Sequence, residues 1–105
     1  MKAEEFVTIF KKHKDNMLNC YLTTFDTKVS KFITDLRLNK EQMLILEKLI
    51  DTLLTDSYYT MLLGLDGVAN IGGIQQTYKI YDEKGNLISD CGDIEVAAYE
   101  VFHGD

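Results

Sequence analysis

The chain has 105 residues, of which 46% are hydrophobic and 27% are charged, and it contains no proline. This length and composition predict a single globular domain over residues 1–105 and exclude the disordered and fibrous classes. The net charge of −6 is unevenly spread: residues 1–52 carry nine Lys/Arg against eight Asp/Glu, whereas residues 53–105 carry two against nine. Such an acidic half repels phosphates, so nucleic-acid binding is not expected.

The N-terminal segment alternates charged and apolar residues and lacks the apolar stretch of a signal peptide. No segment has the roughly eighteen consecutive apolar residues of a membrane span. We therefore expect a cytoplasmic protein that makes no membrane contact. Cys20 and Cys91 lie 71 positions apart, without a CxxC or Cys/His cluster around either. Free thiols and no metal site are expected, and a disulfide between the two is a less favoured alternative.

Helices are predicted along the first half of the chain. Apolar residues at intervals of three, four and seven predict a first helix over residues 4–22. The run FDTKVSKFITDL, residues 25–36, repeats the pattern after a break near residues 23–24 and predicts a second helix.

A third helix is predicted to begin after Asn39. The Asn39 side chain can accept from the first free amides while Gln42 reaches back, which is the pattern of a capping box. The apolar stripe that follows is broad, so we expect this helix to be the most buried of the set. Residues 55–57, Thr-Asp-Ser, offer a second cap, and the sequence leaves open whether one bent helix or two helices run to residue 65.

The hydrophobic period changes to two after Gly73. The segment QQTYKIYDEKGNLIS, residues 75–89, predicts a β-hairpin with a turn at residues 82–85. Residues 93–102 predict a helix with Asp93 as its cap and Gly104 as its stop, with a third strand over residues 94–102 as the alternative. The expected fold class is therefore α+β, in which N-terminal helices pack with a late antiparallel β-hairpin and a C-terminal helix.

Asp66 ends an apolar run and is followed by glycines, in the stretch LLGLDGVANIGG. Glycine at the end of a helix accounts for this stretch, because it satisfies the last carbonyls in a left-handed conformation. The alternative is a ligand-binding or catalytic carboxylate in a pocket under the Gly72-Gly73 loop. The glycines do not form a phosphate loop, and YDEKGNLISDCGD does not fit a calcium loop. No cofactor, metal or catalytic residue is therefore assigned.

The acidic residues of the second half are the main candidates for a binding surface. Their surplus is one-sided, which favours a basic protein partner, although a charge run is more often a solvated face. The set comprises Asp82, Glu83, Asp90, Asp93, Glu95 and Glu100.

The pieces LLGLDG, GG, YKIYDEKGN and AYEVFH resemble, over about residues 60–105, the C-terminal halves of small acidic bacterial immunity proteins, which protect a cell by capping a toxin. The resemblance implies a binding protein without catalysis. The leading hypothesis is thus an immunity protein or inhibitor that caps a basic partner through the acidic surface. Two others stay open: an enzyme or ligand-binding domain that uses Asp66, and a homo-oligomeric structural protein that uses its Tyr and Phe side chains.

Overall fold

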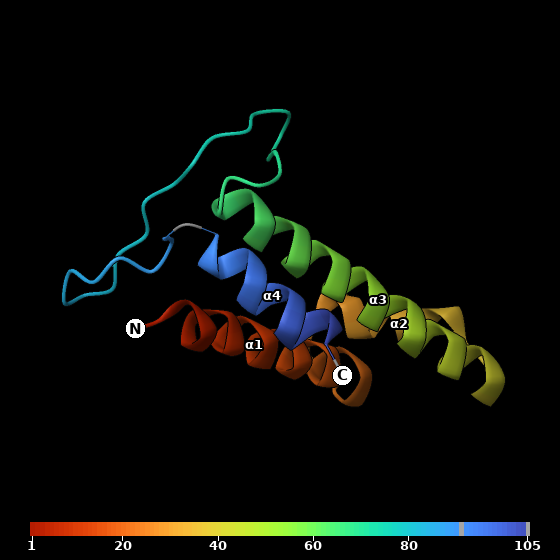
Figure 1. Ribbon diagram of the computed structural model, residues 1–105. Helices are drawn as coiled ribbons and strands as arrows, with labels where there is room; N and C mark the ends of the chain where they lie inside the picture. Colours follow the sequence, from red (N-terminus) through yellow and green to blue (C-terminus); the bar gives the residue numbers. More distant parts are fainter. Residues whose placement is uncertain (91, 105) are drawn as a thin grey trace.

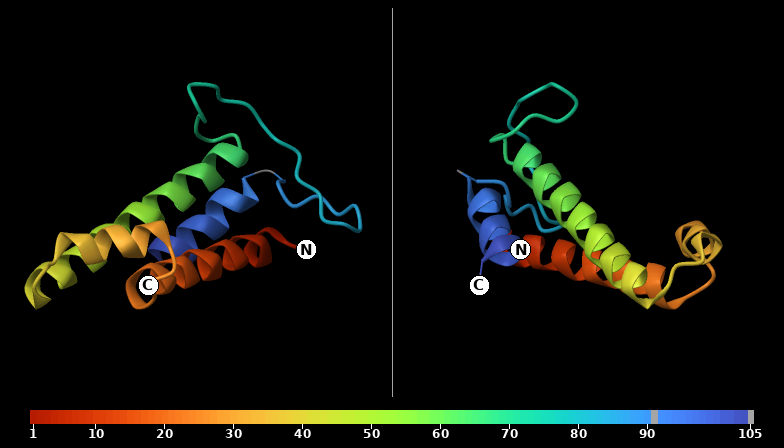
Figure 2. Two further views of the ribbon diagram at one scale, coloured as in Figure 1. Left: turned by 180° about the vertical axis from the view of Figure 1, so that it is seen from behind. Right: turned by 90° about the vertical axis from the view of Figure 1, so that its right-hand side faces the viewer.

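The computed structural model describes residues 1–90 and 92–104, which form four helices (Figure 1). The helices are α1 (Ala3–Thr23), α2 (Lys28–Leu36), α3 (Lys40–Leu65) and α4 (Asp93–His103). In this part of the chain α1, α3 and α4 pack on one another, whereas α2 packs against α1 alone. The right-hand view of Figure 2 shows α2 set apart from α3. The molecule is elongated, with a longest extent of 47 Å.

The predicted first and second helices are confirmed. α1 ends at the expected break, with Thr24 as its C-cap. α2 begins at Lys28, three residues after the predicted start, because Thr27 is the N-cap and its Oγ1 accepts from the Ser30 amide at 2.9 Å. Ser30 in turn donates its hydroxyl to the carbonyl of Tyr21, which ties α2 to the end of α1.

The capping box at the start of α3 is also confirmed. The Gln42 amide donates to Asn39 Oδ1 at 2.9 Å, and the Asn39 amide donates to Gln42 Oε1 at 3.0 Å. α3 then runs unbroken to Leu65. The Ser57 hydroxyl donates to the carbonyl of Leu53 at 2.8 Å, so this residue bonds back along the helix instead of starting a new one.

The predicted α+β class is wrong, because the described residues form helices and contain no strand. The segment of the expected hairpin retains its turn, in which Gly85 has φ +85° and donates its amide to the carbonyl of Asp82. Beyond the turn there is only an isolated bridge between Tyr81 and Leu87. The alternation of apolar and polar residues in this segment therefore indicated an extended backbone, but not two strands paired in a sheet.

Ser89 explains why the pairing stops. Its hydroxyl accepts from the Ile80 amide at 2.9 Å and donates to the carbonyl of Tyr78 at 2.7 Å. A side chain thus occupies backbone groups that a strand ladder would use, and a two-stranded hairpin is marginal on its own. The buried Ile88 anchors the segment on the helices without a sheet.

The C-terminal segment is helical, as predicted, and the strand alternative is wrong. Asp93 was predicted as the N-cap of this helix, but the N-cap is Gly92, with φ +81°. Asp93 is the first residue of α4, so the helix begins one position earlier than expected. Gly104 stands at the C-cap as predicted, with its amide bonded to the carbonyl of Glu100.

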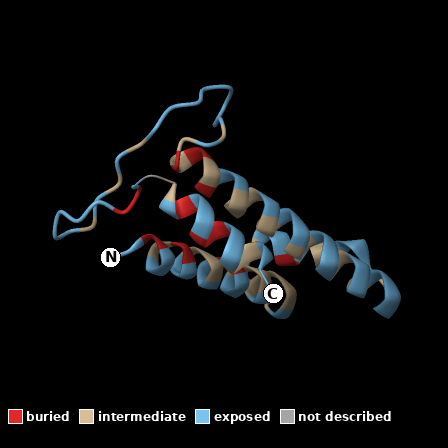
Figure 3. Cartoon of the chain, in the orientation of Figure 1, coloured by how far each residue is buried: buried red, intermediate tan, exposed pale blue. Residues whose placement is uncertain are grey.

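The core lies where α1, α4 and the C-terminal part of α3 meet (Figure 3). Its buried hydrophobic members are Ala3, Val7, Leu62, Ile88, Ile94, Ala97 and Ala98. The prediction that the third helix is the most buried is wrong. Only Leu62 and Gly64 of α3 are buried, and the first half of the helix is largely exposed.

Candidate functional site

Asp66 is a capping residue that joins two helices. It is the C-cap of α3, and its Oδ2 accepts a hydrogen bond from the Glu95 amide at 2.9 Å, in the first turn of α4. The side chain is buried. The end of one helix therefore satisfies a free amide at the start of another, which accounts for this carboxylate structurally.

The surroundings of Asp66 alter its acidity. Burial raises the pKa of Asp66, and the charges of Glu95 and Asp93 raise it further, while the hydrogen bond from the Glu95 amide acts in the opposite direction. Gly92 precedes α4 with φ +81°, a backbone conformation that favours glycine, and a Cβ there would make only an ordinary contact with Asp66 Oδ2, at 3.8 Å.

The Gly72-Gly73 loop is an exposed turn. Ile71 and Ile74 close it with two backbone hydrogen bonds, of 2.9 and 3.1 Å. A Cβ added to either glycine would meet no atom within 4 Å. The two glycines therefore do not lie against Asp66. No contact between the loop and Asp66 supports the hypothesis that a ligand is held between them.

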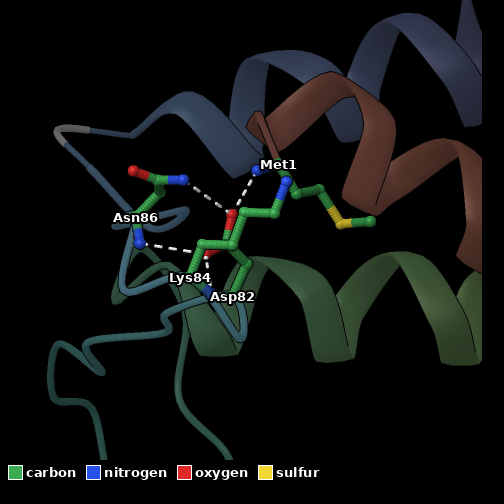
Figure 4. A network of polar contacts seen from close by, with 4 residues as sticks. All are labelled: Met1, Asp82, Lys84 and Asn86. Carbon is green, nitrogen blue, oxygen red and sulfur yellow. Dashed lines mark hydrogen bonds and ion pairs between the residues drawn. The ribbon is translucent and has the colours of Figure 1, made fainter.

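Asp82 stands apart from the other predicted acidic residues because its carboxylate organises a turn (Figure 4). It accepts from the amides of Lys84 and Asn86, both at 2.9 Å, and from the Asn86 side chain at 3.1 Å. The amino group of Met1 forms an ion pair with it. This ammonium group and the hydrogen bonds from Asn86 and Lys84 hold the pKa of Asp82 well below its ordinary value.

The other five predicted acidic residues are exposed: Glu83, Asp90, Asp93, Glu95 and Glu100. Asp90 and Asp93 line one hollow of about 640 Å³, and Glu83 lines another of about 460 Å³. Glu5 of α1 borders both hollows and was not singled out from the sequence. The acidic surface is therefore divided between two neighbouring depressions, while Glu95 and Glu100 lie along α4 outside them.

Lys14 is a buried cation that the sequence analysis did not single out. Its side chain is 4% exposed, and its Nζ lies 2.5 Å from Asp51 Oδ1 of α3 and 2.9 Å from Asp15 Oδ1. Burial alone would lower the pKa of Lys14, but its hydrogen bonds to Asp51 and Asp15 and their charges outweigh burial and raise it. The ion pair thus links α1 to the middle of α3.

An apolar groove of about 570 Å³ opens between α1 and α3, lined by Ile9, Phe10, His13, Tyr58 and Met61. The Tyr58 ring meets Phe10 edge to face, with centroids 6.4 Å apart, and its hydroxyl donates to Met17 Sδ at 3.0 Å. These contacts fix the floor of the groove, while Ile9 and Met61 at its rim are exposed.

Two apolar stripes extend the exposed surface away from the core. On α2, Val29, Phe32 and Leu36 recur at helical spacing and are exposed, Phe32 by 68%. On α3, Ile45, Leu49 and Leu53 do the same, Leu49 by 58%. We call these six residues the apolar stripes. In the described structure α2 and α3 do not pack against each other, so neither stripe covers the other.

The comparisons leave these surfaces without a precedent. The chain matches no family model, and searches of curated proteins and of solved structures return no match.

Residues 1–90 and 92–104 hold no cluster of three or more His, Cys, Asp or Glu side chains placed to bind a metal ion. Within the same residues no helix combines the length and apolarity needed to cross a membrane. Cys20 is half-buried, with its Sγ 3.8 Å from Thr24 Oγ1, whereas the prediction for Cys91 lies outside the described residues. What the molecule offers for binding is thus the apolar groove, the apolar stripes and the acidic hollows.

Proposed function

We propose that the protein is a non-catalytic protein-binding domain whose main recognition surface is the pair of apolar stripes on α2 and α3. The observation that carries the proposal is the exposure of Phe32 and Leu49, each in the middle of a stripe with helical spacing. Soluble monomers rarely expose contiguous apolar patches larger than a few hundred Å², and larger ones mark interaction sites.

The energetic argument rests on what covering a stripe would contribute. Full burial of a Leu or Phe side chain stabilises by about 1.5–3 kcal/mol, so a few such residues suffice for specific association. The stripes lie on regular helices, α2 and α3, and the second is fixed at its start by the capping box of Asn39 and Gln42. A partner would therefore meet a preformed surface and lose little conformational entropy on the side of this chain.

A basic protein is the second candidate partner, for the acidic hollows. The favouring observation is that Glu5 on α1 borders both the hollow of Asp90 and Asp93 and that of Glu83. Acidic residues outnumber Lys2, Lys84 and the Met1 amino group in these linings and leave a net negative field. An inhibitor of the immunity type would use such a field to accelerate docking, and association would slow as salt rises.

Affinity capture with matched variants tests the proposal. The wild-type protein, a Phe32→Ser/Leu49→Ser variant and an Asp90→Ser/Asp93→Ser variant are immobilised and exposed to the same extract at low and moderate salt. A stoichiometric protein retained by wild type and lost from the Phe32→Ser/Leu49→Ser variant alone supports the apolar stripes. Loss from the acidic variant alone, with release by salt, transfers recognition to the hollows. Equal retention by all three contradicts both surfaces.

A further inference from the structure

We infer that the apolar stripes are the interface of a homodimer, in which a second copy of this chain covers α2 and the first half of α3. The inference rests on the proposed protein-binding function and names its partner. It is carried by three observations on the described residues: the excess of exposed surface, the shape of the molecule and the distribution of charge.

The exposed surface is too large for a folded monomer of this size. A monomeric protein of 12.0 kDa is expected to expose about 6,000 Å², whereas the described chain exposes 7572 Å². The excess of about 1,600 Å² is twice the roughly 800 Å² that each partner buries in a standard interface. A second copy thus has enough surface to cover without any change in the fold.

Two parts of the molecule contribute to the excess of exposed surface. The radius of gyration is 16.3 Å, against about 13 Å for a compact domain of this length. Buried residues concentrate where α1, α4 and the end of α3 meet, whereas the α3–α4 connection over residues 67–87 and the opposite end, with α2 and the start of α3, are mostly exposed (Figure 3). The apolar stripes are on this opposite end, which is where the chain lacks a covering layer of its own.

The charge distribution favours a copy of the same chain at that end. Residues 25–57, which contain both stripes, carry five Lys/Arg and six Asp/Glu, a net charge of −1. Two such surfaces can meet without mutual repulsion, and the mixed signs at their rims can pair. Residues 53–105 carry a net −7, so two copies that met through the acidic end would repel each other.

The exposed apolar residues of the α3–α4 connection provide a matched control. Ile71 and Ile74 are 40% and 63% exposed, but they flank a turn and do not repeat at helical spacing. If exposure alone drove association, replacing them would matter as much as replacing the stripe residues. The homodimer instead requires that replacing the stripe residues abolishes association and that replacing Ile71 and Ile74 does not.

The test is the mass in solution over a wide range of protein concentrations, by sedimentation equilibrium, for wild type, Phe32→Ser/Leu49→Ser and Ile71→Ser/Ile74→Ser. We expect wild type and the Ile71→Ser/Ile74→Ser variant to have twice the 12.0 kDa chain mass, and the stripe variant to have the chain mass with unchanged far-UV circular dichroism. Because the region is nearly neutral, we expect the dimerisation constant to change less than tenfold between low and moderate salt.

Three outcomes overturn the inference: a monomeric wild type at all concentrations, a dimer that the stripe variant leaves intact, or a dimer lost only in the Ile71→Ser/Ile74→Ser variant. If the stripe variant does not fold, single Phe32→Ser and Leu49→Ser variants replace it. The proposed function fails separately. A monomeric wild type that captures another protein through Phe32 and Leu49 contradicts the dimer and supports protein binding, whereas a monomer whose captured proteins ignore both residues contradicts the two together.

Discussion

Leu62 and Leu49 belong to the same helix, yet Leu62 is completely buried and Leu49 is 58% exposed. The first lies at the packed end of the molecule, where α1, α4 and the last turns of α3 meet, and the second at the open end, which consists of α2 and the first half of α3. Both ends present apolar residues at helical spacing. Such spacing therefore identifies the apolar side of a helix but not what covers it.

Replacing Leu62 and Leu49 by Ala should reveal the largest difference in the free energy of unfolding between the two ends. Leu62→Ala should lower the free energy of unfolding by about 2–5 kcal/mol, because it leaves a cavity in a packed core. Leu49→Ala should change it by about 0.5 kcal/mol or less in the monomer, since surface substitutions are small. Urea denaturation at concentrations where the chain is monomeric measures both. Equal losses would contradict the division into a packed and an open end.

The ion pair of Lys14 lies between the two ends, and breaking it should have the next largest effect. Asp51→Ala should cost about 1–3 kcal/mol, because Lys14 stays buried with only Asp15 as its partner. Lys14→Met should be close to neutral, since an apolar side chain of similar length needs no partner. A double-mutant cycle from urea denaturation gives the coupling energy, and a coupling near zero would contradict the pair.

The pH dependence gives a second measure of the Lys14 pair. Because the pKa of Lys14 is raised in the folded state, its pairing stabilises the fold below its ordinary pKa of 10.5 and this contribution is lost as the pH rises through the folded value. The wild type should therefore lose stability at strongly alkaline pH relative to Lys14→Met. Parallel pH profiles of the two proteins would show that Lys14 is not coupled to folding.

Substitutions of Asp66 should change the free energy of unfolding less than breaking the Lys14 pair does. The Ala and Asn substitutions should also differ from each other. Asp66→Ala leaves the Glu95 amide without its partner and should cost about 1–2 kcal/mol. Asp66→Asn keeps an acceptor oxygen without the charge. Since the pKa of Asp66 is raised, its contribution is favourable below the ordinary value of 3.8 and is lost as the pH rises through the folded value. Asp66→Asn should thus be at least as stable as wild type at neutral pH.

Thermal unfolding from acid to neutral pH tests this behaviour. The difference between wild type and Asp66→Asn should disappear as the pH falls below 3.8. A ligand-binding role for Asp66 would predict instead that Asp66→Ala, too, unfolds like wild type and that both variants differ only in binding. Unchanged unfolding of Asp66→Ala would remove the capping explanation.

Among the substitutions that break a hydrogen bond, the smallest effect is expected at the open end, at the start of α3. Asn39→Ala should cost about 0.5–1 kcal/mol, because it removes an exposed N-cap bond. Gln42→Ala removes the reciprocal bond and is the matched control, with a still smaller loss. Urea denaturation measures both. If the open end is covered by a second copy, these losses should also weaken dimerisation, and sedimentation equilibrium of Asn39→Ala would detect it.

The local chemistry of the helices could be predicted from the sequence, because caps depend on residues close together along the chain. Asn39 and Gln42 form the expected capping box, and the turn at Gly85 has the expected conformation. The missing hairpin could not be predicted from alternation, since it depends on Ser89 taking backbone partners of Tyr78 and Ile80. Extended segments and strands share one pattern, and only long-range pairing separates them.

The candidate surfaces were predicted less well, for the same reason. Lys14 stands in the charged run KKHKDN, which gave no sign that its partner would be Asp51 from another helix. The acidic residues were expected on one surface, but Asp82 forms a turn and the rest divide between hollows and α4. Each of these outcomes depends on which helix faces of this one chain meet, and that information is not local.

α3 connects the packed end to the open end as a single rigid rod, and this has a mechanical consequence. Its 26 residues span about 39 Å at 1.5 Å per residue, most of the 47 Å length of the molecule. Because the Lys14 pair ties the helix to α1 at Asp51, the part that can swing is the stretch from Lys40 to Asp51, about 17 Å long, and a rotation of about 10° there would carry its first turn through about 3 Å. Movement of the core would therefore reach the start of the stripe on α3 only through the Lys14 pair.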